Sequence, residues 1–586
     1  MAIGWQLDFR LILMRFVILT AFIFLLGTFS FVQVVQHDRY VDLSQGNRIR
    51  RVWIAAPRGK ILDRNGKVLV DNRPSFDVSL DYKALKESSK PVEYLSGVLN
   101  LSAEEIQNRL EKYRGPAYLS VPVARDVNLE TLTRVEESRF DMPLVTVDVT
   151  PVRNYVRGKL ACGILGYVGA IDASRYQELK DSGYHWLDVI GKTGIEASYE
   201  AFLKGESGGM QVEVDHRGHR EQILSIKKAI PGRDVYLTID LKVQNALEEV
   251  LEGKIGAGIA MNPQTGEILG SVSEPNYDLN IFIKPEERQS VLNLLKDERR
   301  PLSNKVFQGL YGPGSVFKLV VAAAGLDLGL IQADQVVRCD GSLQVGGRVF
   351  HCWRPGGHGD VTLVQAIQQS CNVFFYYLGQ RLGPERIAEY ARRFGLGEIS
   401  GIDAIQERNG LVPDERWKKE RLHESWYGGD TANFSVGQGF VTLTPIQMAV
   451  MISAIANGGH LLRPYLVKKV VSPDAHTWVE MGPKVTREVG VSAHALETIR
   501  KAMRMVVNEP GGTGRLARLD GVDVCGKTGT VQIKRGEGMV KNGWFVSYAP
   551  YENPEIVLVL LVEGVESGGQ DVAPLAKIVL EKYFSK

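Results

Sequence analysis

One stretch of nine residues decides how this sequence is interpreted: GPGSVFKLV, residues 312–320. It places Ser315 and Lys318 three positions apart, after a turn-forming Gly-Pro-Gly and before the apolar run 319–324. Residues i and i+3 share one face of a helix, so a buried Lys318, with its pKa lowered by desolvation, could take the serine proton. An ordinary helix start, with Ser315 as N-cap and Lys318 in solvent, fits the same spacing. The stretch alone leaves both interpretations open.

The composition is that of an ordinary globular protein. The 586 residues are 44% hydrophobic and 24% charged, which suits roughly three or four domains. The 70 Lys and Arg residues against 68 Asp and Glu residues give a net charge of +2. Because such a balance creates no field that attracts a polyanion, we expect no nucleic-acid partner. Five cysteines are too few for a disulfide-built scaffold of this size.

A membrane anchor is predicted near the N-terminus. Residues 16–35, FVILTAFIFLLGTFSFVQVV, contain no charged residue and match the ~20 residues that cross a bilayer. A cleaved signal peptide is the alternative, but the apolar stretch is long and no A-x-A-like site follows it. We therefore expect an uncleaved anchor over residues 16–36. Basic residues on both sides of the span leave its orientation open.

Two regions with different residue patterns follow the anchor. The first, to about residue 231, is polar and mixed, with a hairpin predicted over 56–70 and a loop leading into a helix over 191–209. The second, residues 232–586, alternates helices and strands, with a hairpin predicted over 257–273 and a final helix over 573–583. Hairpins outnumber β-α-β crossovers, so we expect a mixed α/β (α+β) domain whose central antiparallel sheet is flanked by helices.

Two more polar motifs lie downstream of Ser315. They are Ser370-Cys371-Asn372, between two helical stretches, and Lys527-Thr528-Gly529-Thr530. Each motif is weak alone, because a second Ser-x-x-Lys occurs at 225–228 and a second Lys-Thr-Gly at 192–194. The order of the three is the signature of the penicillin-interacting serine enzymes.

The first two motifs supply the groups that acyl transfer needs. Ser315 would attack a carbonyl and Lys318 would accept its proton. Ser370 and Asn372 would relay protons and hold the substrate amide.

The third motif is predicted to lie on an edge strand. Gly529 lets a peptide backbone approach closely and pair as an added strand. Lys527 and the hydroxyls of Thr528 and Thr530 would bind a substrate carboxylate. The backbone N–H groups of Ser315 and Thr530 are the expected oxyanion hole.

At these residues the sequence resembles the class B penicillin-binding proteins, and specifically the elongation-type penicillin-binding protein 2 family. The likeness covers nearly the whole chain, including PRGKILDRNG (57–66), GIEASYEAFLKG (194–205), YGPGSVFK (311–318), GGHGDVTLVQAIQQSCNVFFYYLG (356–379), GDTANFSVGQGFVTLTPIQMA (429–449) and GKTGT (526–530).

The resemblance implies a single-pass protein of the cytoplasmic (inner) membrane. Its parts would be a cytoplasmic tail (1–15), the anchor (16–36), an elongated mixed α/β pedestal of the dimerisation type (37–231) and a penicillin-binding transpeptidase domain (232–586). The catalytic domain would lie on the periplasmic, extracytoplasmic side, which settles the orientation that charge left open.

The resemblance also implies the reaction, the cross-linking of peptidoglycan during cell elongation and rod-shape maintenance. Ser315 would attack the D-alanyl-D-alanine end of a stem peptide, and an amine from a neighbouring stem would resolve the acyl-enzyme. β-Lactam antibiotics would acylate the same serine, and hydrolysis of the acyl-enzyme would give a D,D-carboxypeptidase side activity. The implied partners are a SEDS-family glycosyltransferase (RodA-type) and elongation-complex proteins (MreC-type).

Two other functions fit parts of the same sequence. A β-lactam-binding sensor or scaffold would use the fold only to bind partners, although all the reactive groups are present here. The division-type, septal class B transpeptidase shares the three motifs, but the segment 429–439 and the cysteine cluster look more like the elongation type.

Three of the five cysteines gather with a histidine in a glycine-rich stretch. We expect Cys339, Cys352, His358 and Cys371 to bind one structural zinc ion, because three thiolates and an imidazole make a closed tetrahedral site. The spacing is not that of a zinc finger, and a Cys339–Cys352 disulfide is the alternative in an oxidising compartment. The resemblance adds that members of the family can carry a metal in this region. His351 is the alternative ligand.

Overall fold

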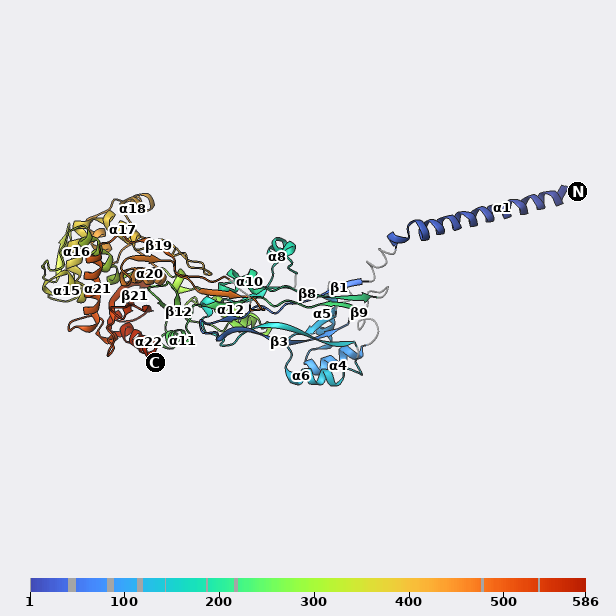
Figure 1. Cartoon of the computed structure of the whole chain (residues 1–586), viewed down its shortest axis with the longest axis horizontal. Coiled ribbons are helices and arrows are strands. Elements are labelled where there is room, and N and C mark those ends of the chain that lie inside the picture. Colours follow the sequence, from blue (N-terminus) through green and yellow to red (C-terminus); the bar gives the residue numbers. More distant parts are fainter. Residues whose placement is uncertain are drawn as a thin grey trace. The chain divides into compact units, whose positions relative to one another are not determined.

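The structure is a computed structural model that describes residues 2–40, 49–81, 89–112, 120–142, 144–185, 188–214, 220–475, 479–535 and 538–585. The chain forms two compact units (Figure 1). The first comprises Met1–Pro57, Arg73–Val152 and Glu206–Ile230, and the second comprises Arg58–Asn72, Arg153–Gly205 and Pro231–Lys586. Three separate segments of the chain thus make up the second unit. The predicted boundary between pedestal and transpeptidase domain, at residue 231, remains a prediction.

The apolar N-terminal segment forms one long helix. α1 (Ala2–Ser30) continues into a π-helical turn (Phe31–Val35). Within it, the span Leu11–Val35 contains an 18-residue window with a mean hydropathy of 2.4, and none of that window is buried against the protein. The hydroxyls of Thr20 and Thr28 donate to Phe16 O and Phe24 O, so both polar side chains are satisfied within the helix. Among the described residues this is the helix long and apolar enough to cross a membrane.

The rest of the first unit has a small core and a separate sheet. The core lies between α4 (Lys90–Leu99), α5 (Ala103–Lys112), α6 (Leu129–Glu137), β4 (Val121–Ala124) and parts of β3 (Val68–Leu80) and β5 (Val145–Tyr155). The separate sheet is antiparallel, in the order β1 (Ile49–Ile54), β8 (Gly208–Val214) and β9 (Arg220–Lys227).

The second unit includes short pieces from the first half of the chain. β2 (Ile61–Leu62) pairs with the start of β3 across the Asn65-Gly66 turn, so the predicted hairpin is confirmed. β10 (Asp234–Leu237) runs parallel to β2 and antiparallel to β18 (Val467–Val471). The predicted helix after residue 191 forms as α9 (Gly194–Ser198) and α10 (Glu200–Leu203).

The second unit is built around a five-stranded antiparallel sheet. Its order is β12 (Ile268–Glu274), β11 (Gly256–Met261), β22 (Ile556–Glu563), β21 (Gly538–Ala549) and β20 (Cys525–Arg535). β11 and β12 form the predicted hairpin, and β20, which carries the Lys-Thr-Gly-Thr motif, is the predicted edge strand. The mixed α/β fold class is confirmed.

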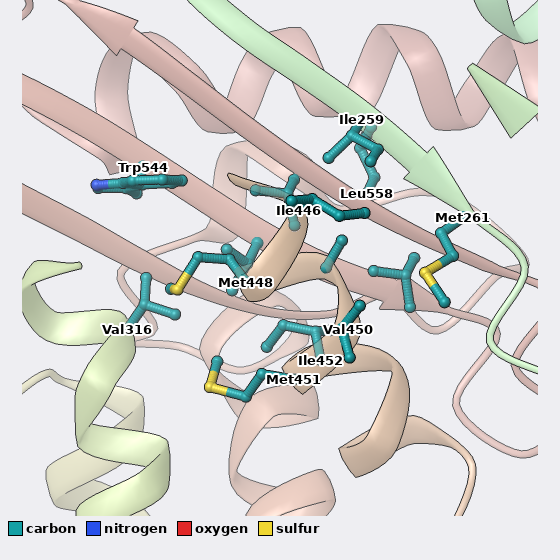
Figure 2. Packing of buried hydrophobic residues seen from close by; sticks show 14 of the residues in the cluster. Ile259, Met261, Val316, Ile446, Met448, Val450, Met451, Ile452, Trp544 and Leu558 are labelled. Atoms are coloured by element: carbon teal, nitrogen blue, oxygen red, sulfur yellow. The ribbon is translucent and has the colours of Figure 1, made fainter. Parts of the chain in front are cut away.

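Helices cover both faces of this sheet. α20 (Pro445–Ala456) begins with a Thr444 capping box and Pro445 in its first turn, and all its residues are buried. Figure 2 shows its side chains, Ile446 among them, against Ile259 of β11 and Leu558 of β22. Successive strand residues face opposite sides, and a side chain at Gly258 would meet Leu247 and Leu251 of α11 (Leu241–Leu251), so α11 covers the other face. α22 (Ala573–Phe584) packs beside α11.

A helical region flanks the edge strand and carries the first two motifs. α14 (Lys318–Asp327) packs against α16 (Asn372–Leu382), α17 (Pro384–Arg393) and α21 (Ala493–Asn508). Ser370-Cys371-Asn372 joins α15 (Leu363–Gln368) to α16, between two helices as predicted.

Candidate active site and metal-binding cluster

The Ser315 turn is held from two sides. Residues Gly314–Phe317 form one 3-10 turn that leads directly into α14, and Ser315 is half-buried. The Gly314 N–H donates to Gly437 O at 2.9 Å, and Trp544 Nε1 of β21 donates to Gly312 O at 2.9 Å. Gly314 has φ +55, which glycine adopts without strain. Ser315 therefore sits on a fixed turn, and Lys318 lies one turn further along the chain.

Lys318 is fully buried and bonded to the Ser370 loop. Its Nζ donates to Ser370 O at 2.8 Å, to Asn372 Oδ1 at 2.7 Å and to Ser370 Oγ at 3.3 Å. Lys527, also fully buried, donates from its Nζ to the same Ser370 Oγ at 3.0 Å. The fold thus gathers one residue of each motif around a single hydroxyl, which rules out the solvated lysine of the ordinary helix start.

Burial changes the proton affinity of both lysines. Desolvation lowers the pKa of Lys318 to about 8. Desolvation, together with the nearby charge of Lys318, lowers the pKa of Lys527 well below its usual value. At pH 7 about a tenth of the Lys318 side chain is therefore the neutral amine, which can accept a proton, and the share grows as the pH rises toward 8.

Ser370 has an uncommon backbone conformation. Its φ is +57, in the left-handed region that a side chain rarely adopts. Trp353 Nε1 donates to both Gln369 O and Ser370 O at 3.1 Å, and so helps to hold this loop. Strain of this kind persists where the surroundings fix it, and it is common at functional sites.

The Lys-Thr-Gly-Thr motif lies along the edge of the sheet. Thr528 and Thr530 project from the same face of β20, because side chains alternate along a strand. The N–H of Gly568 donates to Thr530 Oγ1 at 3.2 Å. A side chain at Gly529 would contact Pro313 O at 3.2 Å, so the strand passes close to the Ser315 turn.

The four predicted metal ligands also come together. The sulfur atoms of Cys339, Cys352 and Cys371 and one ring nitrogen of His358 all lie within 4.8 Å of one another. His358 Nδ1 is 3.6 Å from Cys339 Sγ and 3.5 Å from Cys352 Sγ. Three sulfurs and one nitrogen at this spacing fit a tetrahedral metal ion, and the cluster could hold one. All five cysteines are free and buried, and His351 lies outside the cluster.

The cluster touches the Ser370 loop directly. Cys371 stands between Ser370 and Asn372, and the Asn372 N–H donates to Cys352 Sγ at 3.4 Å. A hydrogen bond from Cys371 lowers the pKa of the Cys352 thiol, which favours the thiolate that a metal would bind.

Some residues near the site were not predicted from the sequence. Gly437 supports the Ser315 turn, Trp353 and Gly568 contact the second and third motifs, and Thr513 lies beside Thr528. Apart from the position of Trp353 beside Cys352, no spacing connects these residues to the motifs, because each contact joins two different elements of the fold.

Comparison with known proteins agrees with this geometry. The penicillin binding protein transpeptidase domain matches residues 256–581, and the penicillin-binding protein dimerisation domain matches residues 53–237. Peptidoglycan D,D-transpeptidase MrdA of Haemophilus influenzae is 31% identical, covering 95% of this chain and 88% of the relative.

Two solved structures are similar over most of the chain. One is the complex between penicillin-binding protein 2 and MreC from Helicobacter pylori, with a TM-score of 0.80 and 27% identity over 91% of this chain and 98% of that chain. The other, described as structural coordination of polymerization and crosslinking by a peptidoglycan synthase complex, has a TM-score of 0.74 and 30% identity over 98% of both chains.

The sheet, the three gathered motifs and these matches define a class: the chain belongs to the class B penicillin-binding proteins, with a dimerisation and a transpeptidase domain. Its similarity to relatives over the full length narrows this further. It is a serine-type peptidoglycan D,D-transpeptidase of the MrdA, penicillin-binding protein 2, elongation type.

Proposed function

We propose that Ser315 is the nucleophile of this transpeptidase and that Lys318 is its general base. The observation that carries the proposal is the buried Lys318 amine, one turn after Ser315, with a pKa of about 8. Ser315 attacks the carbonyl of the penultimate D-alanine, and its proton passes to Lys318 Nζ. The N–H groups of Ser315 and Thr530 stabilise the oxyanion.

The Ser370 hydroxyl then serves as a proton relay. It accepts from both lysines, so its own proton is free to move to the amine of the departing D-alanine, while Lys318 passes to Ser370 the proton that it took from Ser315. The acceptor amine of a second stem peptide loses its proton by the reverse route and attacks the acyl-enzyme. Asn372 fixes Lys318 through its Oδ1 and is placed to hold the substrate amide.

The carboxylate end of the substrate is assigned to β20. Thr528 and Thr530 donate hydroxyl hydrogens to it, and Lys527 supplies positive charge. Although burial lowers the pKa of Lys527, an arriving carboxylate favours its charged form. Gly529 lets the edge strand lie close to the Ser315 turn, and the peptide pairs with the strand edge beside that turn.

Labelling with a fluorescent penicillin tests the nucleophile. We expect the full-length chain in detergent to be labelled on the peptide that contains Ser315, and Ser315→Ala to abolish the label. Ser225→Ala is the matched control, because Ser225 opens the other Ser-x-x-Lys, on strand β9. Label that persists on Ser315→Ala would assign the nucleophile elsewhere.

We further propose that the Cys3His cluster holds zinc in a structural role. Its four ligands leave no open position, and thiolates with one imidazole favour this ion. Elemental analysis of the purified full-length chain should give one zinc per chain. A peptide-mapped Cys339–Cys352 disulfide with no zinc would contradict the proposal.

We also infer a single-pass arrangement in the cytoplasmic membrane, with the transpeptidase domain (232–586) outside and the pedestal (37–231) next to the membrane. The apolar α1 supports the anchor. The relatives in complex with MreC and in a peptidoglycan synthase complex support MreC-type and RodA-type partners. When protease is added to spheroplasts, it should digest the transpeptidase domain but leave a tag placed before residue 10 intact. Co-purification should recover the MreC-type and the RodA-type partner. A tag that is digested would reverse the orientation.

A further inference from the structure

Thr513 lies on a loop that the three motifs do not include. The loop follows α21 and ends at the 3-10 turn Arg515–Ala517. Thr513 is half-buried, and its Oγ1 is 2.8 Å from Oγ1 of Thr528 on the edge strand. The contact therefore joins a loop residue to one of the two hydroxyls proposed to bind the substrate carboxylate.

The loop is fixed to the neighbourhood of Ser370. The Thr513 N–H donates to Gln368 O at 3.4 Å, and Gln368 Nε2 donates to Pro510 O at 2.9 Å. Gln368 is buried at the end of α15, two residues before Ser370. On the other side, a side chain at Gly569 would lie 2.4 Å from Thr513 O and 3.6 Å from the Thr528 methyl. The backbone of Thr513 is thus bonded to Gln368, next to the second motif, and its side chain is bonded to Thr528 of the third motif.

Hydroxyl chemistry gives this contact a direction. A threonine hydroxyl has one hydrogen to donate and two lone pairs that accept. A carboxylate only accepts, so a Thr528 that binds it must give it the hydrogen and must accept from Thr513. The hydrogen bonds then run from Thr513 to Thr528 to the carboxylate, and each strengthens the next. Thr530 has the same arrangement, since the Gly568 N–H donates to its oxygen.

We propose that Thr513 is a positioning residue that orients the Thr528 hydroxyl toward the substrate carboxylate and so sets the preference of the enzyme for carboxylate-bearing acyl donors. The proposal rests on the proposed function, in which β20 binds that carboxylate. Its signature is a change in selectivity, because a purely structural loop residue would change all acylation rates alike.

The test compares benzylpenicillin with its methyl ester, which lacks the charge. Second-order acylation rate constants are measured from the mass increase of the intact full-length chain in detergent. For Thr513→Val, which has the same shape but no hydroxyl, we expect the carboxylate-to-ester rate ratio to fall by ~10-fold, the size of one charge-assisted hydrogen bond. Thr513→Ser should keep the ratio of the wild type, and Thr528→Val should lower it.

Each other outcome has a distinct meaning. A Thr513→Val protein with the wild-type ratio, or with both rates lowered in parallel, overturns the positioning role. If Thr513→Val does not fold, Thr513→Ala is judged by the same ratio. A wild-type ratio near one, or an unchanged ratio in Thr528→Val, overturns carboxylate recognition by β20 itself. A lowered ratio in Thr528→Val with an unchanged ratio in Thr513→Val overturns only the role of Thr513.

Discussion

At the scale of single residues, the site depends on two buried lysines that meet at one hydroxyl. Because only the neutral Lys318 amine can accept the serine proton, the acylation rate should rise with pH through about 8 and then level off. Lys318→Ala should acylate ~100-fold or more slowly, the usual size of general-base catalysis. Stopped-flow labelling with a fluorescent penicillin measures both. A flat pH profile, or a normal rate in the variant, would contradict the assignment.

The same lowered pKa has a consequence for stability. A lysine whose pKa falls from 10.5 to about 8 on folding binds fewer protons in the folded state between those values. The free energy of unfolding therefore rises with pH across that window. At neutral pH the lowered pKa of Lys318 therefore reduces the free energy of unfolding, although the same lowered pKa supplies the neutral amine that the proposed reaction needs.

The sequence points to the proposed reactive residues more directly than to the residues that hold them. Ser315, Lys318, Ser370, Asn372 and Lys527 are predicted from the order of three short motifs. The structure gathers the side chains of the last four, and it places Ser315 on the turn just before Lys318. The indole of Trp353 and the hydroxyl of Thr513 were not predicted. Their contacts with Ser370 and Thr528 join different elements that lie 17 and 15 residues apart, and no motif spacing encodes them.

At the scale of elements, the Ser315 turn depends on a neighbouring turn. Gly437 has φ +71, and a side chain there would lie 2.2 Å from Gly314 O and 2.7 Å from Phe317 Cβ. Gly437→Ala should therefore shift the Ser315 turn, with a loss of about 1–3 kcal/mol in stability from overpacking. Penicillin acylation should fall by ~10-fold or more, because a displaced nucleophile loses its attack geometry. Gly458→Ala is the matched control, because Gly458 also has a positive φ, +85, but nothing lies within 4 Å. Equal rates in the two variants would exclude the steric explanation.

The Cys3His cluster joins four segments around the start of α16. Cys339 ends β13 (Val337–Cys339), Cys352 follows β15 (Arg348–His351), His358 precedes β16 (Gly359–Val361), and Cys371 precedes α16. Removal of the proposed zinc by a chelator should lower the melting temperature and slow acylation, because Asn372 is bonded to Cys352. Cys371→Ala should lose the metal, whereas Cys162→Ala, a buried cysteine outside the cluster, should keep it. A chelated protein with unchanged melting and acylation would show that the metal has no such role.

At the scale of the whole molecule, each of the two compact units is built from three separate segments of the chain, whereas the sequence suggests two consecutive regions. The pattern change near residue 232 marks where the regular sheet and helices begin. It gives no sign that residues 58–72 and 153–205 pack with them, because those segments are short and their partners lie far along the chain. A buried group of charges in these segments is an example of such a long-range contact.

Glu196 is the centre of that group. It is fully buried and accepts from Arg153 Nε at 2.6 Å and from Arg58 Nη2 at 2.9 Å. Arg58 also pairs with Glu200. Burial alone would lower the pKa of Arg58, but the two carboxylates raise it above its usual value, so the guanidinium stays charged. The Glu196 carboxylate, on α9, thereby joins the loop that carries Arg58 to strand β5, which carries Arg153.

Glu196→Gln should separate the stability of the fold from the chemistry of the site. It leaves two buried guanidinium groups with one carboxylate, so we expect the free energy of unfolding to fall by about 3–5 kcal/mol. Glu130→Gln, which removes an exposed pair with Arg134, should cost less than about 1 kcal/mol. Because Glu196 contacts no residue of the three motifs, folded Glu196→Gln protein should still be acylated within about twofold of the wild-type rate, an effect well below 1 kcal/mol. Cells that rely on it should lose their rod shape as the temperature rises. A folded variant that is not acylated would mean that this charge group controls the site itself.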